Sequence, residues 1–134
     1  METELQRRLF TADEYHRMAE AGVLRDDDRV ELLDGEIVEM TPIGSHHAAC
    51  VDRLIVLLKI CVEGRAIIRV QGPIRLNTRS EPQPDLSILK PRADFYASAH
   101  PMPDDVLLVI EVADSSLRSD RHIKVPLYAR AGIR

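Results

Sequence analysis

The sequence has no tryptophan and few other aromatic residues, with two phenylalanines and three tyrosines among 134 residues. The core must therefore be aliphatic, built mainly from valine, isoleucine and leucine. Long apolar runs are also missing, because the longest, Leu54–Leu58 and Val106–Ile110, are far too short to span a bilayer. The acidic segment Met1–Glu4 lacks the apolar region of a signal peptide. These absences predict a cytoplasmic protein without a membrane partner.

Cysteine is scarce as well. Cys50 and Cys61 fall on one expected helix, roughly 16 Å apart along its axis, so they cannot form a disulfide and we expect reduced, buried thiols. His46 lies four residues from Cys50, but two ligands alone do not make a zinc site. The net charge of −4 argues against a protein that coats nucleic acid nonspecifically, although a basic groove on one face would still allow a nuclease.

The composition is that of a globular protein, with 45% hydrophobic and 30% charged residues, and predicts one domain over residues 1–134. Thr11–Glu14 is a capping-box sequence, so a short helix should follow and end near Gly22. Asp34-Gly35 predicts a hairpin turn between extended segments 29–33 and 36–40.

The rest of the chain alternates between helical and extended patterns. A helix capped by Ser45 should run to about Glu63, and its wide apolar face predicts burial on more than one side. We expect strands at 66–71, 73–77, 85–89 and 106–113, the last covered on both faces because its apolar residues do not alternate. A final helix should run from Ser119 to about Ala131, with Pro126 kinking it or shifting its start. This order predicts an α/β or α+β fold with helices packed on a mixed β-sheet.

Two carboxylates carry the chemical hypothesis. Glu111 lies within the apolar run 106–113, and a carboxylate buried there needs a cation or hydrogen-bond donors. It either pairs with a basic residue, binds a metal, or emerges at the strand end. Asp85 follows Pro84 at the start of its strand, and Pro-Asp alone is more often a turn. Together, two carboxylates on neighbouring strands are a plausible site for Mg²⁺ or Mn²⁺, which would support phosphodiester hydrolysis.

A third, cationic group would help to orient the nucleophile and hold charge. Lys124, on the helix after the Glu111 strand, is the candidate. The alternative is that Lys124 makes a solvated surface pair with Asp120, four residues earlier on the same helix.

The order and spacing of several short motifs resemble the Uma family, which is classed as endonucleases with a restriction-endonuclease-like fold. The resemblance runs from Phe10 through nearly the whole chain. Its motifs are Val30–Glu36, Thr41–His47, Pro84-Asp85, Ile110–Val112 with Ser115-Ser116, and Asp120 with Lys124, Tyr128 and Gly132.

The resemblance implies a restriction-endonuclease-like core of the PD-(D/E)xK type. It makes Asp85 and Glu111 the catalytic acids, with a divalent metal between them and the carbonyl of Val112 as a further ligand. The lysine usual two residues after the second acid would fall at Ala113, and the similarity suggests that Lys124 replaces it. Members of the family usually continue with an aromatic-rich strand and a hairpin, so residues 1–134 are expected to form a single domain that lacks this C-terminal element.

Other residues are secondary candidates. Glu31 could face the metal, although a surface carboxylate is the alternative, and His47 could donate a supporting hydrogen bond. Nucleic-acid contacts are expected from arginines, for which scattered surface charge is the alternative. The main ones are Arg75, Arg118 and Arg121, with Arg79 and Arg92 as further members of a basic groove.

The leading hypothesis is a metal-dependent endonuclease acting on nucleic acid, with DNA as the first candidate. A catalytically silent nucleic-acid-binding or regulatory module of the same fold is the second. The third is a truncated subunit completed by a partner, and a homodimer is considered by analogy with such nucleases.

Overall fold

The computed structural model describes residues 4–113 and 120–134. Residues 120 and 121 are described by their backbone only. Helix α1 (Ala12–Glu20) is followed by β1 (Val30–Leu33), β2 (Glu36–Glu39) and the long helix α2 (Ser45–Val62). After these come β3 (Ile67–Val70), β4 (Leu86–Leu89), the short turn η1 (Pro103–Asp105) and β5 (Val106–Ile110). The chain ends with a π-helical turn, η2 (Asp120–Lys124), which leads into α4 (Val125–Arg130).

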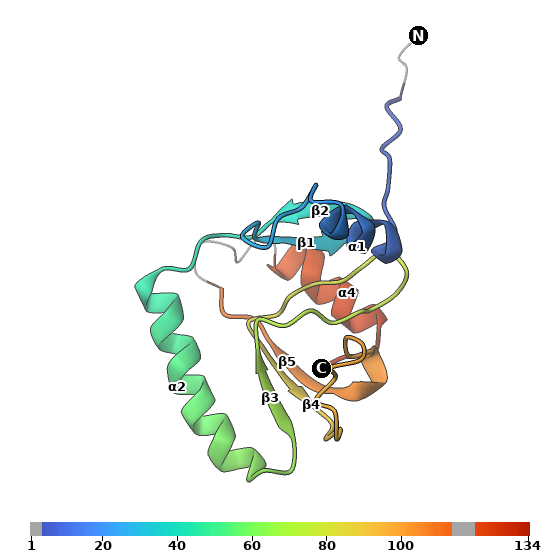
Figure 1. The fold of residues 1–134 in the computed structure, drawn as a ribbon. Helices are drawn as coiled ribbons and strands as arrows, with labels where there is room; N and C mark the ends of the chain where they lie inside the picture. Colours follow the sequence, from blue (N-terminus) through green and yellow to red (C-terminus); the bar gives the residue numbers. More distant parts are fainter. Residues whose placement is uncertain (1–3, 114–119) are drawn as a thin grey trace.

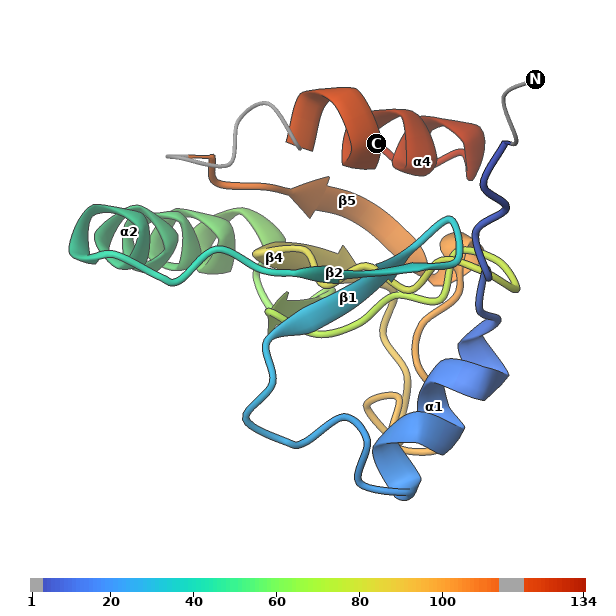
Figure 2. The same ribbon diagram turned by 90° about the horizontal axis from the view of Figure 1, so that it is seen from above.

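The described strands form two separate antiparallel sheets. One is the β1-β2 hairpin and the other is β3-β4-β5, with β4 in the centre. The fold is therefore α+β, as the sequence predicts, but the pairings of the described strands are antiparallel rather than mixed. Figure 1 shows the hairpin lying across one end of the three-stranded sheet, and Figure 2 shows α4 running beside β5.

Local sequence signals explain the N-terminal elements. The Thr11 hydroxyl accepts from the Glu14 N–H at 3.2 Å, and the Glu14 carboxylate accepts from the Thr11 N–H at 3.0 Å, which completes the predicted capping box. Asp34 and Gly35 have φ of 48° and 83°, as a two-residue type I′ turn requires. Both predictions are confirmed.

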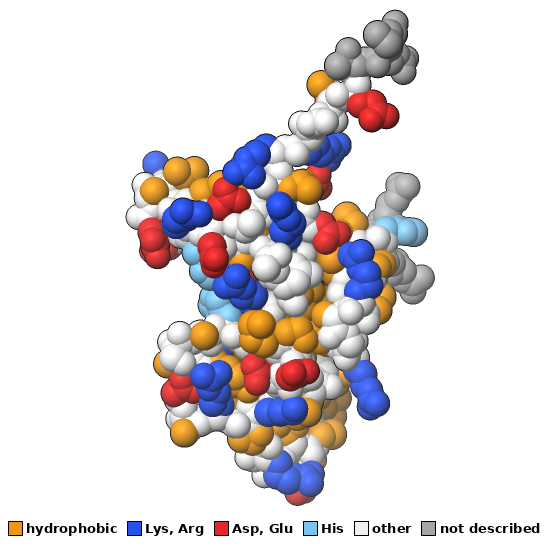
Figure 3. Space-filling view, turned by 90° about the vertical axis from the view of Figure 1, so that its right-hand side faces the viewer, with side chains coloured by type: hydrophobic (Ala, Val, Ile, Leu, Met, Phe, Trp, Pro, Cys, Tyr) orange, Lys and Arg blue, Asp and Glu red, His pale blue; other side chains and the backbone are white. Residues whose placement is uncertain are grey.

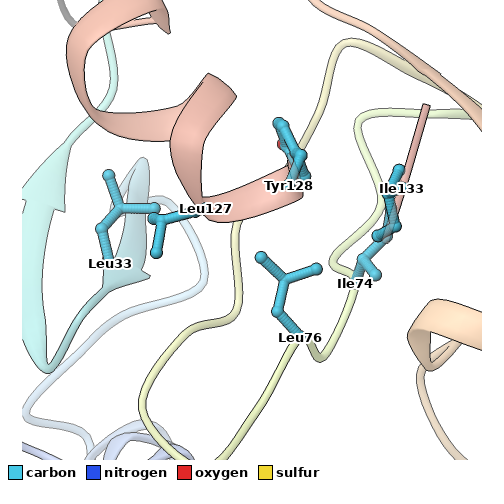
Figure 4. Close-up of a cluster of buried hydrophobic side chains, with 6 residues drawn as sticks. All are labelled: Leu33, Ile74, Leu76, Leu127, Tyr128 and Ile133. Carbon is cyan, nitrogen blue, oxygen red and sulfur yellow. The ribbon is translucent and has the colours of Figure 1, made fainter. Parts of the chain in front are cut away.

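The core consists of two small clusters. The larger one lies between α4, β1 and the segment before β4 (Figure 4) and contains Leu33, Ile74, Leu76, Leu127, Tyr128 and Ile133. The smaller one fixes α1 to the hairpin through Ala12, Tyr15 and Leu32. Both clusters sit beside the hairpin, so β1 is buried on both sides.

Helix α2 departs most from expectation. Its N-cap is Gly44 rather than Ser45. Val51 is its one buried residue, whereas Val56, Leu57 and Ile60 are 58% to 67% exposed. The prediction of burial on several sides is wrong, because the main packing of α2 against another described element is with β3 (Figure 1). Cys50 is half-buried, and Cys61 is exposed rather than buried.

Two extended segments also differ from prediction. Residues 73–77 form no ladder, because the N–H groups of Ile74, Arg75 and Leu76 donate to carbonyls of three different residues. Leu107 in β5 is 46% exposed, so that strand is not covered on both faces. Pro126 lies in the first turn of α4, where it removes no helical hydrogen bond, and the α-helix starts there after η2. Within the described part of the chain, no helix has the length and hydropathy of a membrane-spanning segment.

Candidate active site

Sheet register brings the two predicted acids together. Leu86, the first residue of β4, pairs with Ile110, the last residue of β5. Asp85 immediately precedes that pair on one strand and Glu111 immediately follows it on the other. The Val112 N–H donates to Asp85 Oδ2 at 2.7 Å, which ties the two strand ends together. Antiparallel pairing therefore places both carboxylates at one end of the sheet.

Glu111 meets a lysine and a tyrosine from the C-terminal helical segment. Lys124 Nζ lies 3.0 Å from both Glu111 carboxylate oxygens, and the Tyr128 hydroxyl donates to Oε1 at 3.1 Å. These residues are four apart, so both project from one side of the helical segment. Lys124 is only 4% exposed, which overturns the alternative of a solvated surface lysine.

Glu31 brings a third carboxylate from the β1-β2 hairpin. Its Oε1 lies 2.9 Å from Lys124 Nζ and accepts from the Gln83 N–H at 3.1 Å. Glu31 is 6% exposed, so the alternative of a surface carboxylate is wrong. The ammonium of Lys124 thus lies between carboxylates from two different sheets.

These contacts fix the charge state of Lys124. Burial alone would lower the pKa of Lys124, but the charges of Glu111 and Glu31 outweigh it and leave the pKa above its ordinary value. Lys124 is therefore an ammonium near neutral pH. It can supply positive charge and hydrogen bonds, but it cannot act as a proton acceptor.

His47 reaches the site from the first turn of α2. Its Nε2 lies 2.9 Å from Asp85 Oδ1, while Val112 holds the other carboxylate oxygen. Asp85 is thereby fixed in orientation from two sides. The structure places His47 in the supporting position that the sequence suggested.

These side chains line a single pocket. Its volume is about 110 Å³, well above the ~15 Å³ that one water needs. The members that matter here are Glu31, His47, Asp85, Glu111, Val112 and Lys124, joined by Arg29 and Gln83. Three carboxylates in a pocket with room for water are the oxygen donors that Mg²⁺ or Mn²⁺ prefers, so the residues fit a hard divalent ion.

The predicted nucleic-acid contacts are not gathered at this pocket. Arg75 lines a different pocket and pairs with Asp13 at 3.3 Å. Arg118 and the side chain of Arg121 lie outside the described residues. Figure 3 shows lysine and arginine scattered among acidic side chains over the face in view. Arg29 is a basic residue at the pocket that the sequence did not single out.

Sequence reasoning gave no role to Tyr128 or Gln83. Tyr128 follows Lys124 by one helical turn, and that spacing is the signal that could have assigned it to Glu111. Gln83 contributes a backbone N–H, for which side-chain identity gives no signal.

Comparison with protein families agrees with this geometry. Residues 12–134 match the model of the family Uma2, described as "Putative restriction endonuclease". The chain belongs to this family. The match spans every residue of the pocket and confirms the resemblance seen in the sequence. No curated protein matches the chain.

Proposed function

We propose that this Uma2 protein is a Mg²⁺- or Mn²⁺-dependent endonuclease that hydrolyses phosphodiester bonds, with DNA as the first candidate substrate. The observation that carries the proposal is the convergence of Asp85, Glu111 and Lys124 on one pocket. Family membership supports nuclease chemistry, and the donor set supports a hard divalent ion. The homodimer considered from the sequence has no support from the family match, and the proposal does not require it.

Asp85 and Glu111 would hold the ion, with the carbonyl of Val112 as a further ligand. A bound ion of this kind acidifies a water and stabilises negative charge on a phosphoryl oxygen. The Val112 N–H and His47 orient Asp85, so its carboxylate does not have to be ordered when the ion arrives.

Lys124 takes the place of the lysine that Ala113 does not provide. Its ammonium touches Glu111 and Glu31 and stays protonated because of them. In this role it is a fixed positive charge beside the scissile phosphate, and it stabilises the transition state electrostatically. Another group, or water itself, must accept the proton of the nucleophile.

One observation favours the catalytically silent alternative. Lys124 already neutralises part of the charge of Glu31 and Glu111, and such a pair can be stable without a metal. A silent module would keep this ion pair as a structural link between the two sheets. The two hypotheses therefore differ in whether the pocket takes up an ion.

The test combines metal binding with cleavage. Mg²⁺ and Mn²⁺ are titrated calorimetrically into the wild type, Asp85→Asn and Glu111→Gln, and plasmid cleavage is followed in the same buffers. Asp52→Asn is the matched control, because Asp52 is exposed on α2. The proposal predicts metal-dependent cleavage that falls by about 10²- to 10³-fold in both pocket variants and is unchanged in Asp52→Asn. A wild type that neither binds metal nor cuts would overturn it in favour of the silent module.

A further inference from the structure

A second group of potential metal ligands lies outside the candidate active site. His16 in α1, Glu81 before β4 and His100 before η1 each offer a ligand atom, and these atoms lie within 4.8 Å of one another. They line an open pocket of about 710 Å³ that shares no lining residue with the first.

His16 and Glu81 are in direct contact. His16 Nε2 lies 2.7 Å and 2.9 Å from the two Glu81 carboxylate oxygens. The His100 ring meets the His16 ring edge-on, at 90° and with centroids 5.8 Å apart. Ligand atoms bound at about 2.0–2.2 Å around one Zn²⁺ lie roughly 3.3 Å apart, so the His16–Glu81 pair would open slightly and His100, whose ligand atom lies within 4.8 Å, would move closer.

Glu81 has unused capacity to bind a cation. It is 5% exposed, yet His16 is its only side-chain partner among the described residues. A carboxylate accepts about four hydrogen bonds, and a buried one with a single partner is costly. The buried Glu31, by contrast, has both an ammonium and a backbone N–H.

We propose that His16, Glu81 and His100 bind a Zn²⁺ ion at a site separate from the candidate active site. Two imidazoles and one carboxylate are a borderline donor set that suits zinc and not magnesium. Three protein ligands leave one coordination position open, and the open pocket gives water access to it. The ion would lie between the His16 nitrogen and the Glu81 carboxylate, which contact each other directly in this structure.

The proposed ion would join three segments that are distant in sequence. His16 belongs to the N-terminal helix, whereas Glu81 and His100 flank β4 and the loop after it. An ion that binds only the folded chain adds its binding free energy to stability. Zinc should therefore raise the unfolding temperature by roughly 10 °C when free Zn²⁺ is about 100 times its Kd.

The test isolates the second site by disabling the first. Zn²⁺ and, separately, Mg²⁺ are titrated calorimetrically into the full chain carrying Asp85→Asn and Glu111→Gln. One equivalent of Zn²⁺ should bind, with no binding of Mg²⁺. Adding His16→Gln, Glu81→Gln or His100→Gln should weaken Zn²⁺ binding by about 100-fold or more. Loss of a residue that only hydrogen-bonds to a metal ligand costs up to about 100-fold, so loss of a ligand itself should cost at least as much.

Two further variants keep the result interpretable. His46→Gln is the matched control, because His46 is an exposed histidine of α2, and it should bind Zn²⁺ like its parent. His100→Cys retains a ligand, so it should bind Co²⁺ with a near-ultraviolet sulfur-to-metal charge-transfer band that the parent lacks. Absence of Zn²⁺ binding, or binding that survives both His16→Gln and His100→Gln, would overturn the proposal. Either failure is independent of nuclease activity, which depends on the other pocket.

Discussion

Glu31 and Glu81 are both buried, at 6% and 5% exposure, but they face opposite environments. Leu32 and Glu81 form an antiparallel bridge, so their side chains share one face, towards α1 and His16. Glu31 is one residue away and projects to the other face, where it meets Lys124. The two glutamates therefore lie on opposite faces of β1, Glu31 on the strand itself and Glu81 on the segment bridged to Leu32.

The two glutamates differ in how their charge is balanced. Glu31 meets a permanent cation, Lys124, whose ammonium is held by two carboxylates. Glu81 meets His16, an imidazole that is charged only when protonated. The first arrangement carries its own counter-ion, and the second offers imidazole nitrogens as potential metal ligands. This contrast is why we assign oxygen-preferring ions to the first pocket and zinc to the second.

Removing the permanent cation should produce the largest change in stability. Lys124→Met keeps most of the side-chain volume but leaves Glu31 and Glu111 without their ammonium, so the free energy of unfolding should fall by about 3–5 kcal/mol. Urea denaturation measures this fall in the free energy of unfolding. Lys59→Met, on the exposed side of α2, is the control. Adding Glu31→Gln to Lys124→Met should restore part of the loss. Equal stability of Lys124→Met and wild type would contradict the described ion pairs.

Removing the orienting imidazole should affect activity more than stability. His47→Ala frees one oxygen of Asp85, and loss of such an outer partner typically costs 10- to 100-fold in activity or metal affinity. Cleavage rates at saturating Mg²⁺ measure this effect. His46→Ala changes the neighbouring exposed histidine and should have no effect. A similar loss in both variants would point to damage of α2 rather than of Asp85.

Alkaline pH should weaken the fold through two groups with raised pKa. The pKa of Lys124 is raised by Glu111 and Glu31 against the effect of burial. The pKa of Tyr15 is raised to about 12 by burial and by the charges of Glu81 and Glu31. A group whose pKa is raised by folding stabilises the folded state at pH values below its unfolded-state pKa, which is near 10 for lysine and tyrosine. This stability is lost as the pH rises through the folded-state pKa.

Urea denaturation from pH 8 to 11.5 tests this dependence. The wild type should lose stability above about pH 10, and Tyr15→Phe and Lys124→Met should each show a shallower decline. A decline as steep in both variants as in the wild type would assign the effect to other groups.

The smallest effect is expected at the second pocket without metal. His16 is 39% exposed, and glutamine at this position keeps a hydrogen-bond donor for Glu81, so the substitution should cost less than loss of the buried Lys124 ammonium. His16→Gln in the presence of a chelator should therefore change the free energy of unfolding far less than Lys124→Met does. A loss of unfolding free energy as large as that of Lys124→Met would mean that His16 balances the charge of Glu81 as strongly as Lys124 balances that of Glu31.

Strand pairing explains why the two acids singled out in the sequence lie at one pocket, while the roles predicted for them stay predictions. Asp85 at a strand start and Glu111 at a strand end are brought together by antiparallel register. Lys124 could be proposed from the need for a cation, but its contact with Glu31 depends on how the hairpin packs on the sheet. No local pattern reports that packing.

The second pocket and the burial of α2 were not predictable in the same way. His16, Glu81 and His100 share no spacing, and tertiary structure alone brings them together. The apolar residues of α2 indicate burial, but whether a helix face is covered depends on which segments reach it. Residues 73–77 look like a strand, yet their N–H groups find partners on several segments instead of one neighbouring strand.

The link between Glu31 and Lys124 also sets an order of events during synthesis. At roughly 5–20 residues per second, the ~90 residues between them take roughly 5–20 s to be translated. Until Lys124 emerges from the ribosome, Glu31 lacks its counter-ion and the pocket lacks its cation. The nascent chain therefore cannot assemble the complete pocket until Lys124 has emerged from the ribosome.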